Sequence, residues 1–328
     1  MNAAPYYSDE SVTLYHGRCE DVLPGLPVGE AHVLLTDPPY FQVKDEDWDN
    51  QWAQAAEFLA WLGGVLDTAK PALTANASAW VFAGPALASS VEAVVRERFR
   101  VLNHVRWVKE AGWHQKAELA AQRRFLTPWE GIVFAEQFHD VYDEQAKALH
   151  KEVFAPLGRY IQTERERAGI TRSDLEVRLG YVSSADPTRG TALAYRWEEG
   201  SSLPTAEAYE RMRAVLGQGY LRREYEDLRR PFVLKPGRPV SDVWSFPTVA
   251  PYPGKHPCEK PGVLLRHMIE VSSRTGDLIL DPFAGSGSTL LAARDLGRRA
   301  VGIEMDERWC DRTATALSQD VLDFGGVA

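Results

Sequence analysis

The tetrapeptide Asp37-Pro38-Pro39-Tyr40 directly follows a short apolar run and combines groups that could do chemistry. Two consecutive prolines fix φ and remove two backbone donors, so the chain must leave the preceding strand as a stiff, exposed ledge. The Asp37 carboxylate and the Pro38 carbonyl could accept both N–H bonds of an amino group on a flat ring, while Tyr40 stacks on the ring itself. The competing interpretation is a strand-ending turn with a solvent-facing Asp37.

A second segment, Asp281–Thr289 (DPFAGSGST), is glycine-rich and lies between an apolar run and a helical one. Gly285 and Gly287 allow a sharp turn and a close approach to a ligand at the carboxyl end of a strand, where α/β sheets bind cofactors. No Lys follows Gly287, so the segment is not a phosphate-binding P-loop. Glu304 ends the next predicted strand and could accept hydrogen bonds from ribose hydroxyls. This acidic lining suits an adenosyl cofactor with a cationic sulfonium; a glycine turn that serves only packing is the alternative.

Apolar periodicity indicates strands that alternate with helices, and these elements must position both motifs. The predicted strands are Val12–His16, His32–Thr36, Ala79–Ala83, Val101–Val108, Gly131–Ala135, Leu278–Asp281 and Ala300–Glu304. The predicted helices are Trp52–Ala69, Pro85–Glu97, Val263–Val271, Ser288–Leu296 and Glu307–Leu317. This alternation predicts an α/β fold, with a mixed, mostly parallel sheet and helices on both faces.

Taken together, the two motifs resemble those of the DNA amino-methyltransferases that use S-adenosylmethionine. Asp37–Tyr40 (DPPY) resembles the catalytic motif, Asp281–Thr289 resembles the cofactor motif, and their order resembles the permuted beta group of that family. Lys255–Pro261 is similar to the family's HPxxKP segment, and Trp107–Lys109 and Trp129-Glu130 are similar to its strand residues. The resemblance spans both flanks of the chain.

This resemblance implies a Rossmann-like methyltransferase that moves a methyl group from S-adenosylmethionine to an exocyclic amine of a base flipped out of double-stranded DNA. The leading Asp37 favours adenine N6, with cytosine N4 as the alternative. The implied catalytic residues are Asp37, Pro38, Pro39 and Tyr40. The implied cofactor-binding residues are Asp281, Phe283, Ala284, Gly285, Ser286, Gly287, Ser288, Thr289, Glu304, Lys260 and Asp21. One departure is Arg18, which stands where the family often has an acidic residue that contacts the adenine of the cofactor. Glu20 or Asp21 could make that contact instead.

The segment 156–230 differs in composition, because every basic side chain in it is Arg and helix-forming charged stretches dominate. Helix start and stop signals predict helices at 157–167, 171–179, 191–198 and 206–216, and a solvated charged helix at 219–230. The string AGITRSDLEVRLG, followed by YRWEEGSSLP, resembles the helix-turn-helix domains of the phage-repressor type, with a longer loop before the second helix. We therefore expect a methyltransferase domain at 1–138 and 231–328, and an inserted all-α target-recognition domain at 139–230 with its helix-turn-helix at about 156–216.

In such a motif the second helix enters the major groove and reads base edges. The implied DNA contacts are Arg189, Thr191, Tyr195 and Arg196, whereas Trp197 is expected in the core. Phosphate contacts are also expected from the basic stretch 96–124, for which Lys109, Arg123 and Arg124 are the candidates. The alternative for the helical segment is an insertion that serves dimerisation or packing. The alternative for the stretch 96–124 is a solvated basic face.

The formal charge of -9, from 37 Lys+Arg against 46 Asp+Glu, bounds solubility without deciding the partner. No apolar run is long enough for a membrane span, and Met1–Glu10 lacks the pattern of a signal peptide. Three scattered cysteines exclude a disulfide framework and a CxxC zinc site. We therefore expect reduced thiols, no metal, no membrane, and a cytoplasmic protein that joins the nucleoid when it binds DNA.

The expected partner is double-stranded DNA, while a homodimer and a cognate restriction endonuclease are left open. Pro257-Cys258 could suggest methylation at cytosine carbon 5, but its HPxxKP context and the lack of a Glu-Asn-Val tripeptide argue against that reaction. Cys258 is instead expected to be a small buried side chain. A non-catalytic helix-turn-helix regulator with a vestigial pocket is the rival from another class, and methylation of RNA or of a protein amide is a third hypothesis.

Overall fold

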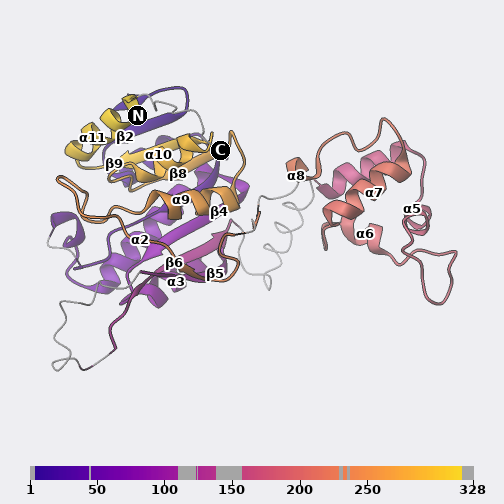
Figure 1. The fold of residues 1–328 in the computed structure, drawn as a ribbon, viewed down its shortest axis with the longest axis horizontal. Helices are drawn as coiled ribbons and strands as arrows, with labels where there is room; N and C mark the ends of the chain where they lie inside the picture. The colour runs from indigo at the N-terminus through magenta and orange to yellow at the C-terminus, as the bar shows by residue number, and fades with distance from the viewer. Residues whose placement is uncertain are drawn as a thin grey trace. The chain divides into compact units, whose positions relative to one another are not determined.

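The computed structural model of the chain describes residues 4–43, 46–109, 123, 125–137, 157–228, 232–234 and 237–319. The chain divides into two compact units (Figure 1): the first is Met1–His139 with Phe232–Ala328, and the second is Asp140–Pro231. The first unit contains a sheet with helices, and the described part of the second unit is helical. Within the described ranges, no helix is both long enough and apolar enough to cross a membrane.

The sheet of the first unit orders its described strands as β1-β2-β9-β8-β3-β4-β6-β5-β7. Their bounds are β1 Tyr7–Ser8, β2 Val12–His16, β3 Ala31–Thr36, β4 Leu73–Ala83, β5 Arg100–Val108, β6 Trp129–Glu136, β7 Val243–Ser245, β8 Leu278–Asp281 and β9 Arg299–Glu304. The run β2-β9-β8-β3-β4 is parallel, whereas β6 pairs antiparallel with both β4 and β5. The predicted α/β class, with a mixed and mostly parallel sheet, is confirmed.

Helices cover both faces of this sheet. The helices of one face are α1 Cys19–Val22, α2 Ala55–Ala69 and α3 Ala88–Arg96, and those of the other are α9 Gly262–Ser272, α10 Ser288–Asp295 and α11 Glu307–Ser318. Neighbouring strand residues point to opposite faces. Trp80 accordingly packs in the core with Met268 and Leu290, while Val81 packs in the core with Phe58. The two apolar cores hold the sheet rigid between the helical layers.

The acidic residues of both motifs lie at one edge of the sheet. Because the carboxyl ends of parallel strands lie at the same edge, the residues that end β3, β8 and β9 or follow them lie there together. Strand β6 runs the other way, so its first residues reach that same edge: Gly131 pairs with Ala83, the last residue of β4. Asp37, Asp281, Glu304 and Glu130 are therefore brought to one edge from four strands.

The main strands and helices of the first unit agree with the sequence predictions within a few residues, except at β4. This strand begins at Leu73, six residues before the predicted start at Ala79. The extra residues, LTANAS, have low strand propensity, and they are recruited by pairing with β3 and β6. The short elements β1, α1 and β7 were not predicted, because two to four residues carry no periodic signal.

The second unit is a small helical bundle. Residues 157–167 are helical, followed by α5 Arg172–Arg178, α6 Leu193–Glu198, α7 Ala206–Leu216 and α8 Tyr225–Leu228. The predicted start of α5 is confirmed, because the Thr171 hydroxyl caps the helix by accepting a hydrogen bond from the Asp174 N–H. Trp197 is 4% exposed and packs with Leu175 and Tyr209, which confirms its predicted place in the core.

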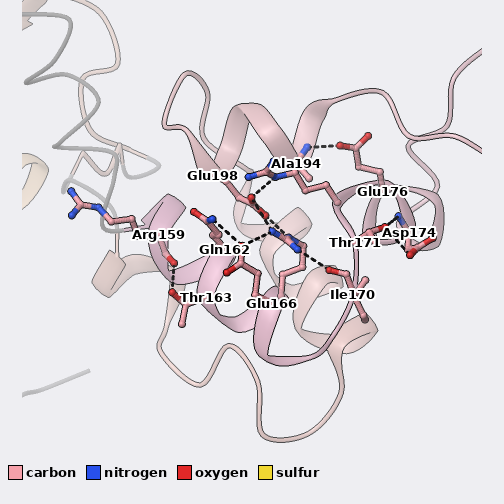
Figure 2. Close-up of polar contacts among 12 residues, drawn as sticks. Arg159, Gln162, Thr163, Glu166, Ile170, Thr171, Asp174, Glu176, Ala194 and Glu198 are labelled. Carbon is pink, nitrogen blue, oxygen red and sulfur yellow. Dashed lines mark hydrogen bonds and ion pairs between the residues drawn. The ribbon is translucent and has the colours of Figure 1, made fainter.

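Buried carboxylates fix α6 within this bundle (Figure 2). Glu198 accepts hydrogen bonds from Arg165 Nε at 2.5 Å and from Arg172 Nε at 2.5 Å. Glu176 accepts a hydrogen bond from the Ala194 N–H at 2.7 Å, near the start of the helix. Breaking one partner of a buried pair leaves an uncompensated charge, which costs about 3–5 kcal/mol. The orientation of α6 is therefore set by electrostatics as well as by the Trp197 side chain.

The predicted charged helix at 219–230 is wrong for its first half. Among the described residues of that range, only Tyr225–Leu228 are helical. Gly219 has φ +98° and Leu221 has φ +44°, both outside the right-handed helical region. Leu221 is fully buried in the bundle core, and its N–H donates to Glu164 Oε2. Burying this leucine outweighs the helix propensity of the charged neighbours.

Replacing Leu221 with Ala should lower the free energy of unfolding of the helical unit by about 2–5 kcal/mol, because it removes a buried side chain and leaves a cavity. Hydrogen exchange of the amides of α5–α7 in the full chain measures this change. Val182→Ala is the matched control, since Val182 is 38% exposed. Equal exchange in the two variants would contradict the placement of Leu221 in the core.

Candidate active site

A cavity of about 640 Å³ opens at the carboxyl edge of the sheet. It brings together both motifs, although they are far apart in the sequence. The predicted residues that line it are Asp37, Pro38, Pro39, Tyr40, Lys260, Asp281, Phe283, Ala284, Gly285, Ser286, Ser288, Thr289 and Glu304. No group of three or more His, Cys, Asp or Glu side chains that could hold a metal ion occurs in the described part of the chain.

Two predicted cofactor residues do not line the cavity. Gly287 is the N-cap of α10 with φ +75°, and an added Cβ would lie 2.4 Å from Thr313 Cγ2, so this glycine serves the turn and the packing on α11. Asp21 is exposed, whereas its neighbour Glu20 lines the cavity and accepts a hydrogen bond from Trp61 Nε1 at 2.6 Å. Arg18 also lines the cavity, and of the two nearby acids only Glu20 does so.

Asp37 directly follows β3, and its two carboxylate oxygens have different surroundings. The Lys260 ammonium contacts Oδ2. Oδ1 is buried and has no hydrogen-bond partner among the described residues. Lys260 was predicted to bind a cofactor; it does line the cavity, but its charged end is committed to the Asp37 carboxylate.

Glu130, the second residue of β6, contacts Tyr40, Lys109 and Lys260 beside Asp37. The Tyr40 hydroxyl donates to Glu130 Oε2 at 3.0 Å, and Lys109 donates to Oε1 at 2.5 Å. The Lys260 ammonium lies 3.7 Å from Oε2. Sequence reasoning noticed Glu130 only as a strand residue, because its role depends on the antiparallel pairing that brings the start of β6 to this edge.

The position of the Tyr40 ring is also fixed by Gly84. An added Cβ at Gly84 would lie 3.0 Å from Tyr40 Cδ2, so a larger residue would push the ring aside. The ring is half-buried and lines the cavity. The hydrogen bond from the Tyr40 hydroxyl to Glu130 and the close approach of Gly84 thus hold the ring at the cavity.

Burial and like charges perturb the acids of the site. Burial raises the pKa of Asp37, and Lys260 opposes that rise. Burial, with the nearby carboxylates of Asp37 and Glu304, raises the pKa of Asp281 to about 7. Burial would lower the pKa of Lys260, but the carboxylates of Asp37 and Glu130 outweigh it and raise this pKa. The cavity is therefore an acidic region in which a cation would be stabilised.

The glycine-rich loop is tied to the end of β9 through Glu304. Glu304 Oε2 accepts a hydrogen bond from the Gly285 N–H at 2.8 Å, and Oε1 accepts one from the Asp306 N–H at 2.7 Å. Each oxygen has a second lone pair, so the carboxylate can still accept hydrogen bonds from a ligand. These bonds orient Glu304 toward the cavity that it lines.

Asp49 is a site residue that the sequence did not reveal. Its carboxylate is fully buried and accepts hydrogen bonds from the N–H groups of Tyr40 and Val43, both at 2.7 Å. Between these two residues, Phe41 and Gln42 have φ values of +61° and +57°, which non-glycine residues rarely adopt. Asp49 therefore holds a strained turn that begins at the end of the DPPY motif; no motif marks it in the sequence.

In the described part of the basic stretch 96–124, most of the basic side chains are engaged within the protein. Arg96 pairs with Glu92, Arg98 with Asp67 and Glu97, Arg100 with Glu136, and Lys109 with Glu130. Ion pairs of this kind lower the charge that is available to DNA. Arg123 is exposed, whereas Arg124 lies outside the described residues.

Cys258 was expected to be buried, and this expectation is wrong. The residue is half-buried and lines the cavity. It belongs to an irregular segment before α9 whose backbone faces the site, since the Cys258 carbonyl accepts a hydrogen bond from Lys260 at 3.4 Å. Cys258 is therefore not part of either apolar core of the sheet, which explains why its side chain is only half-buried.

A mostly parallel sheet with helices on both faces and an acidic cavity at its carboxyl edge defines a doubly wound α/β protein with a ligand site at the strand ends. The chain belongs to the N6_N4_Mtase family, described as DNA methylase, whose model matches residues 31–315. The predicted family is thereby confirmed. The match includes both motifs and the whole helical unit between them.

Similarity to an individual curated relative covers only part of the chain. The chain is 43% identical over 79 residues to the Type II methyltransferase M2.DpnII of Streptococcus pneumoniae, a match that covers 23% of this chain and 30% of that protein. The chain thus matches less than a third of this curated relative's length.

Two solved structures share the fold at low identity. One is TTHA0409 of Thermus thermophilus, a putative DNA modification methylase complexed with S-adenosyl-L-methionine, with TM-score 0.51, 18% identity, and 95% of each chain covered. The other is the PvuII DNA methyltransferase, cytosine-N4-specific, with TM-score 0.58, 13% identity, and 98% of this chain and 91% of that chain covered. These likenesses show the architecture alone.

Replacing Asp49 with Ala should expose the turn at 40–43 to faster hydrogen exchange and lower the free energy of unfolding by about 1–3 kcal/mol, because two buried N–H groups lose their acceptor. Mass-spectrometric exchange of that peptide, with urea unfolding, measures both effects. Asp67→Ala is the control, because the Asp67 side chain is 57% exposed. If Asp49→Ala exchanges like the control, Asp49 does not hold the turn.

Proposed function

We propose that this protein transfers a methyl group from S-adenosylmethionine to the exocyclic amine of a base in double-stranded DNA, adenine N6 ahead of cytosine N4. The observation that carries the proposal is the shared cavity: Asp37, with one buried oxygen that lacks a partner among the described residues, lines it together with the glycine-rich loop and Glu304. Family membership supports the reaction class. The Asp at the head of the DPPY motif supports adenine over cytosine.

The cavity residues fit S-adenosylmethionine. The acids Glu20, Asp281 and Glu304 line it. Burial, with the nearby carboxylates of Asp37 and Glu304, raises the pKa of Asp281, and a sulfonium or amino cation would stabilise its ionised form. The rings of Trp61 and Phe283, 5.5 Å apart, offer apolar surfaces for an adenine. When bound, the cofactor supplies an electrophilic methyl group.

The chain's own residues would then activate the target amine. Its lone pair is delocalised into the base ring, so it is a poor nucleophile. Asp37 Oδ1 and the Pro38 carbonyl would accept its two N–H bonds, localise that lone pair, and stabilise the positive charge that develops on nitrogen. Tyr40, held by Glu130, would stack on the flipped base. Positioning of this kind can supply about 7–11 kcal/mol of the barrier.

We also propose that the helical unit is the target-recognition domain. The four predicted contact residues at and before α6 are all exposed: Arg189, Thr191, Tyr195 and Arg196. The buried Glu198 carboxylate, bound by Arg165, and the buried Glu176 carboxylate, bound by the Ala194 N–H, would hold these four residues in a fixed arrangement. Recognition of base edges requires such a fixed arrangement. An alternative role in packing or dimerisation would leave the methylated sequence unaffected when these residues change.

The proposed setting is the cytoplasm, with nucleoid association when the protein is bound to DNA. A homodimer and a cognate restriction endonuclease are further partners to test, by sedimentation and by a search for cleavage that this methylation blocks. The rival hypothesis of a non-catalytic regulator predicts sequence-specific DNA binding with no label transferred to DNA.

Asp37→Ala should abolish methyl transfer, by at least about a thousandfold, and leave S-adenosylmethionine binding within about threefold, because Asp37 acts on the amine rather than on the cofactor. Duplex DNA incubated with methyl-labelled cofactor, digested and separated into nucleosides, measures transfer and identifies the modified base. Calorimetry measures binding. Normal turnover by Asp37→Ala, or label in neither adenine nor cytosine with the wild type, would refute the proposal.

Arg196→Ala should change or weaken the sequence preference of methylation, because one bidentate base contact is worth about 1–3 kcal/mol. Sequencing of the methylated positions on genomic DNA measures this preference. Arg159→Ala is the matched control: Arg159 is also an exposed Arg of the same unit, and Figure 2 shows its side chain directed away from the Glu198 pairs. An unaltered methylation pattern and rate in Arg196→Ala would count against α6 as the reader.

A further inference from the structure

The groups that surround the Lys260 ammonium form a cage that has no role in the reaction as described so far. Lys260 is 8% exposed, and its ammonium contacts Asp37 Oδ2. It lies 3.7 Å from Glu130 Oε2 and 3.4 Å from the Cys258 carbonyl. The rings of Tyr40 and Phe82 have their centroids 5.1 and 4.9 Å from the same nitrogen. Such a cage holds the cation at one position against the Asp37 carboxylate.

Because of this position of Lys260, the two carboxylate oxygens of Asp37 have different partners. The contact with Lys260 occupies Oδ2, and Oδ1 is left buried without a partner in the described part of the chain. A buried acceptor without a donor is costly, and it is rarely retained without a purpose. Oδ1 is the atom available to accept an N–H of the target amine.

The charges around Asp37 make the ammonium necessary. Three other ionisable groups influence Asp37 or are influenced by it: the carboxylates of Glu130 and Asp281, and the Tyr40 phenol. Lys109 faces Glu130 from the other side and offsets part of its charge. Without Lys260, Asp37 would be a buried acid beside two other acids, and such an acid takes up a proton. A proton on Oδ1 would turn this acceptor into a donor.

We propose that Lys260 is a positioning residue for the methyl transfer: it anchors Oδ2 of Asp37 and keeps the carboxylate ionised, so that Oδ1 accepts the N–H of the target amine. The inference rests on the proposed function and deepens it, because it assigns to Lys260 a role toward the amine and not toward the cofactor. Lys260 acts through Asp37 and does not itself touch the reacting atoms.

Lys260→Met, which removes the charge and keeps the length, tests this role in the full chain. The single-turnover rate of methyl transfer to duplex DNA is measured from pH 6 to 10 with saturating cofactor. We expect at least a hundredfold loss at pH 7, an acid limb moved up by at least one pH unit, and partial recovery at high pH. Cofactor affinity should stay within about threefold. Lys260→Arg keeps the charge, so its acid limb should stay near that of the wild type.

Two outcomes would overturn the proposal. An acid limb that does not move in Lys260→Met would mean that the lysine is only structural. A loss of cofactor affinity that accounts for the lost activity would mean that Lys260 binds the cofactor, as its motif alone suggested. If Lys260→Met does not fold, Lys260→Gln replaces it, since Gln keeps a donor without the charge.

A second measurement separates this inference from the proposed function. The infrared band of a protonated carboxyl group is followed against pH without any substrate, and the Asp37 band is assigned by subtracting spectra of matched Asp37→Asn variants. The inference requires this band to disappear at a pH at least one unit higher in Lys260→Met than in the wild type. If the wild type does not methylate DNA but the band shifts, the proposed function fails and the electrostatic role stands. If the band does not shift, the inference fails whatever the activity.

Discussion

The crowding of carboxyl groups at one edge of the sheet is the constraint on which the site depends. Asp37, Asp281 and Glu304 end three parallel strands or follow them directly, and each is largely removed from water. Buried acids repel one another and tend to protonate unless cations balance them. Lys260 provides that balance next to Asp37, while the region near Asp281 is left acidic. The first condition suits an acceptor that stays ionised, and the second suits a cationic ligand.

The same edge shows how one antiparallel strand changes the chemistry of a parallel sheet. In a wholly parallel sheet, the strand beside β4 would present its last residues here. Because β6 is antiparallel, it presents its first residues instead, and Glu130 joins the site with the hydrogen bonds from Tyr40 and Lys109. Asp49 completes the framework by holding the turn after Tyr40. The rigid DPPY ledge is thus supported by residues that belong to neither motif.

The two units hold their elements in place in two ways. In the first unit, the strand ends are supported by apolar cores on both faces of the sheet. In the helical unit, the apolar core around Trp197 and Leu221 acts together with the buried ion pairs of Glu198 with Arg165 and Arg172. In both units, buried groups fix the elements that carry the exposed or cavity-lining polar side chains.

The sequence by itself determined the order of the main strands and helices, the two motifs, and therefore the family, because apolar periodicity and local turn chemistry are encoded by neighbouring residues. It also located Trp197 in a core and Thr171 at a helix start. Only the tertiary structure decided that Lys260 contacts Asp37, 223 positions away in the chain, that Glu130 and Asp49 support the site, and that Leu221 interrupts an expected helix. These contacts depend on which strand ends and loops meet in space, and on the cost of burying charge and apolar surface there. No local pattern of residues carries that information.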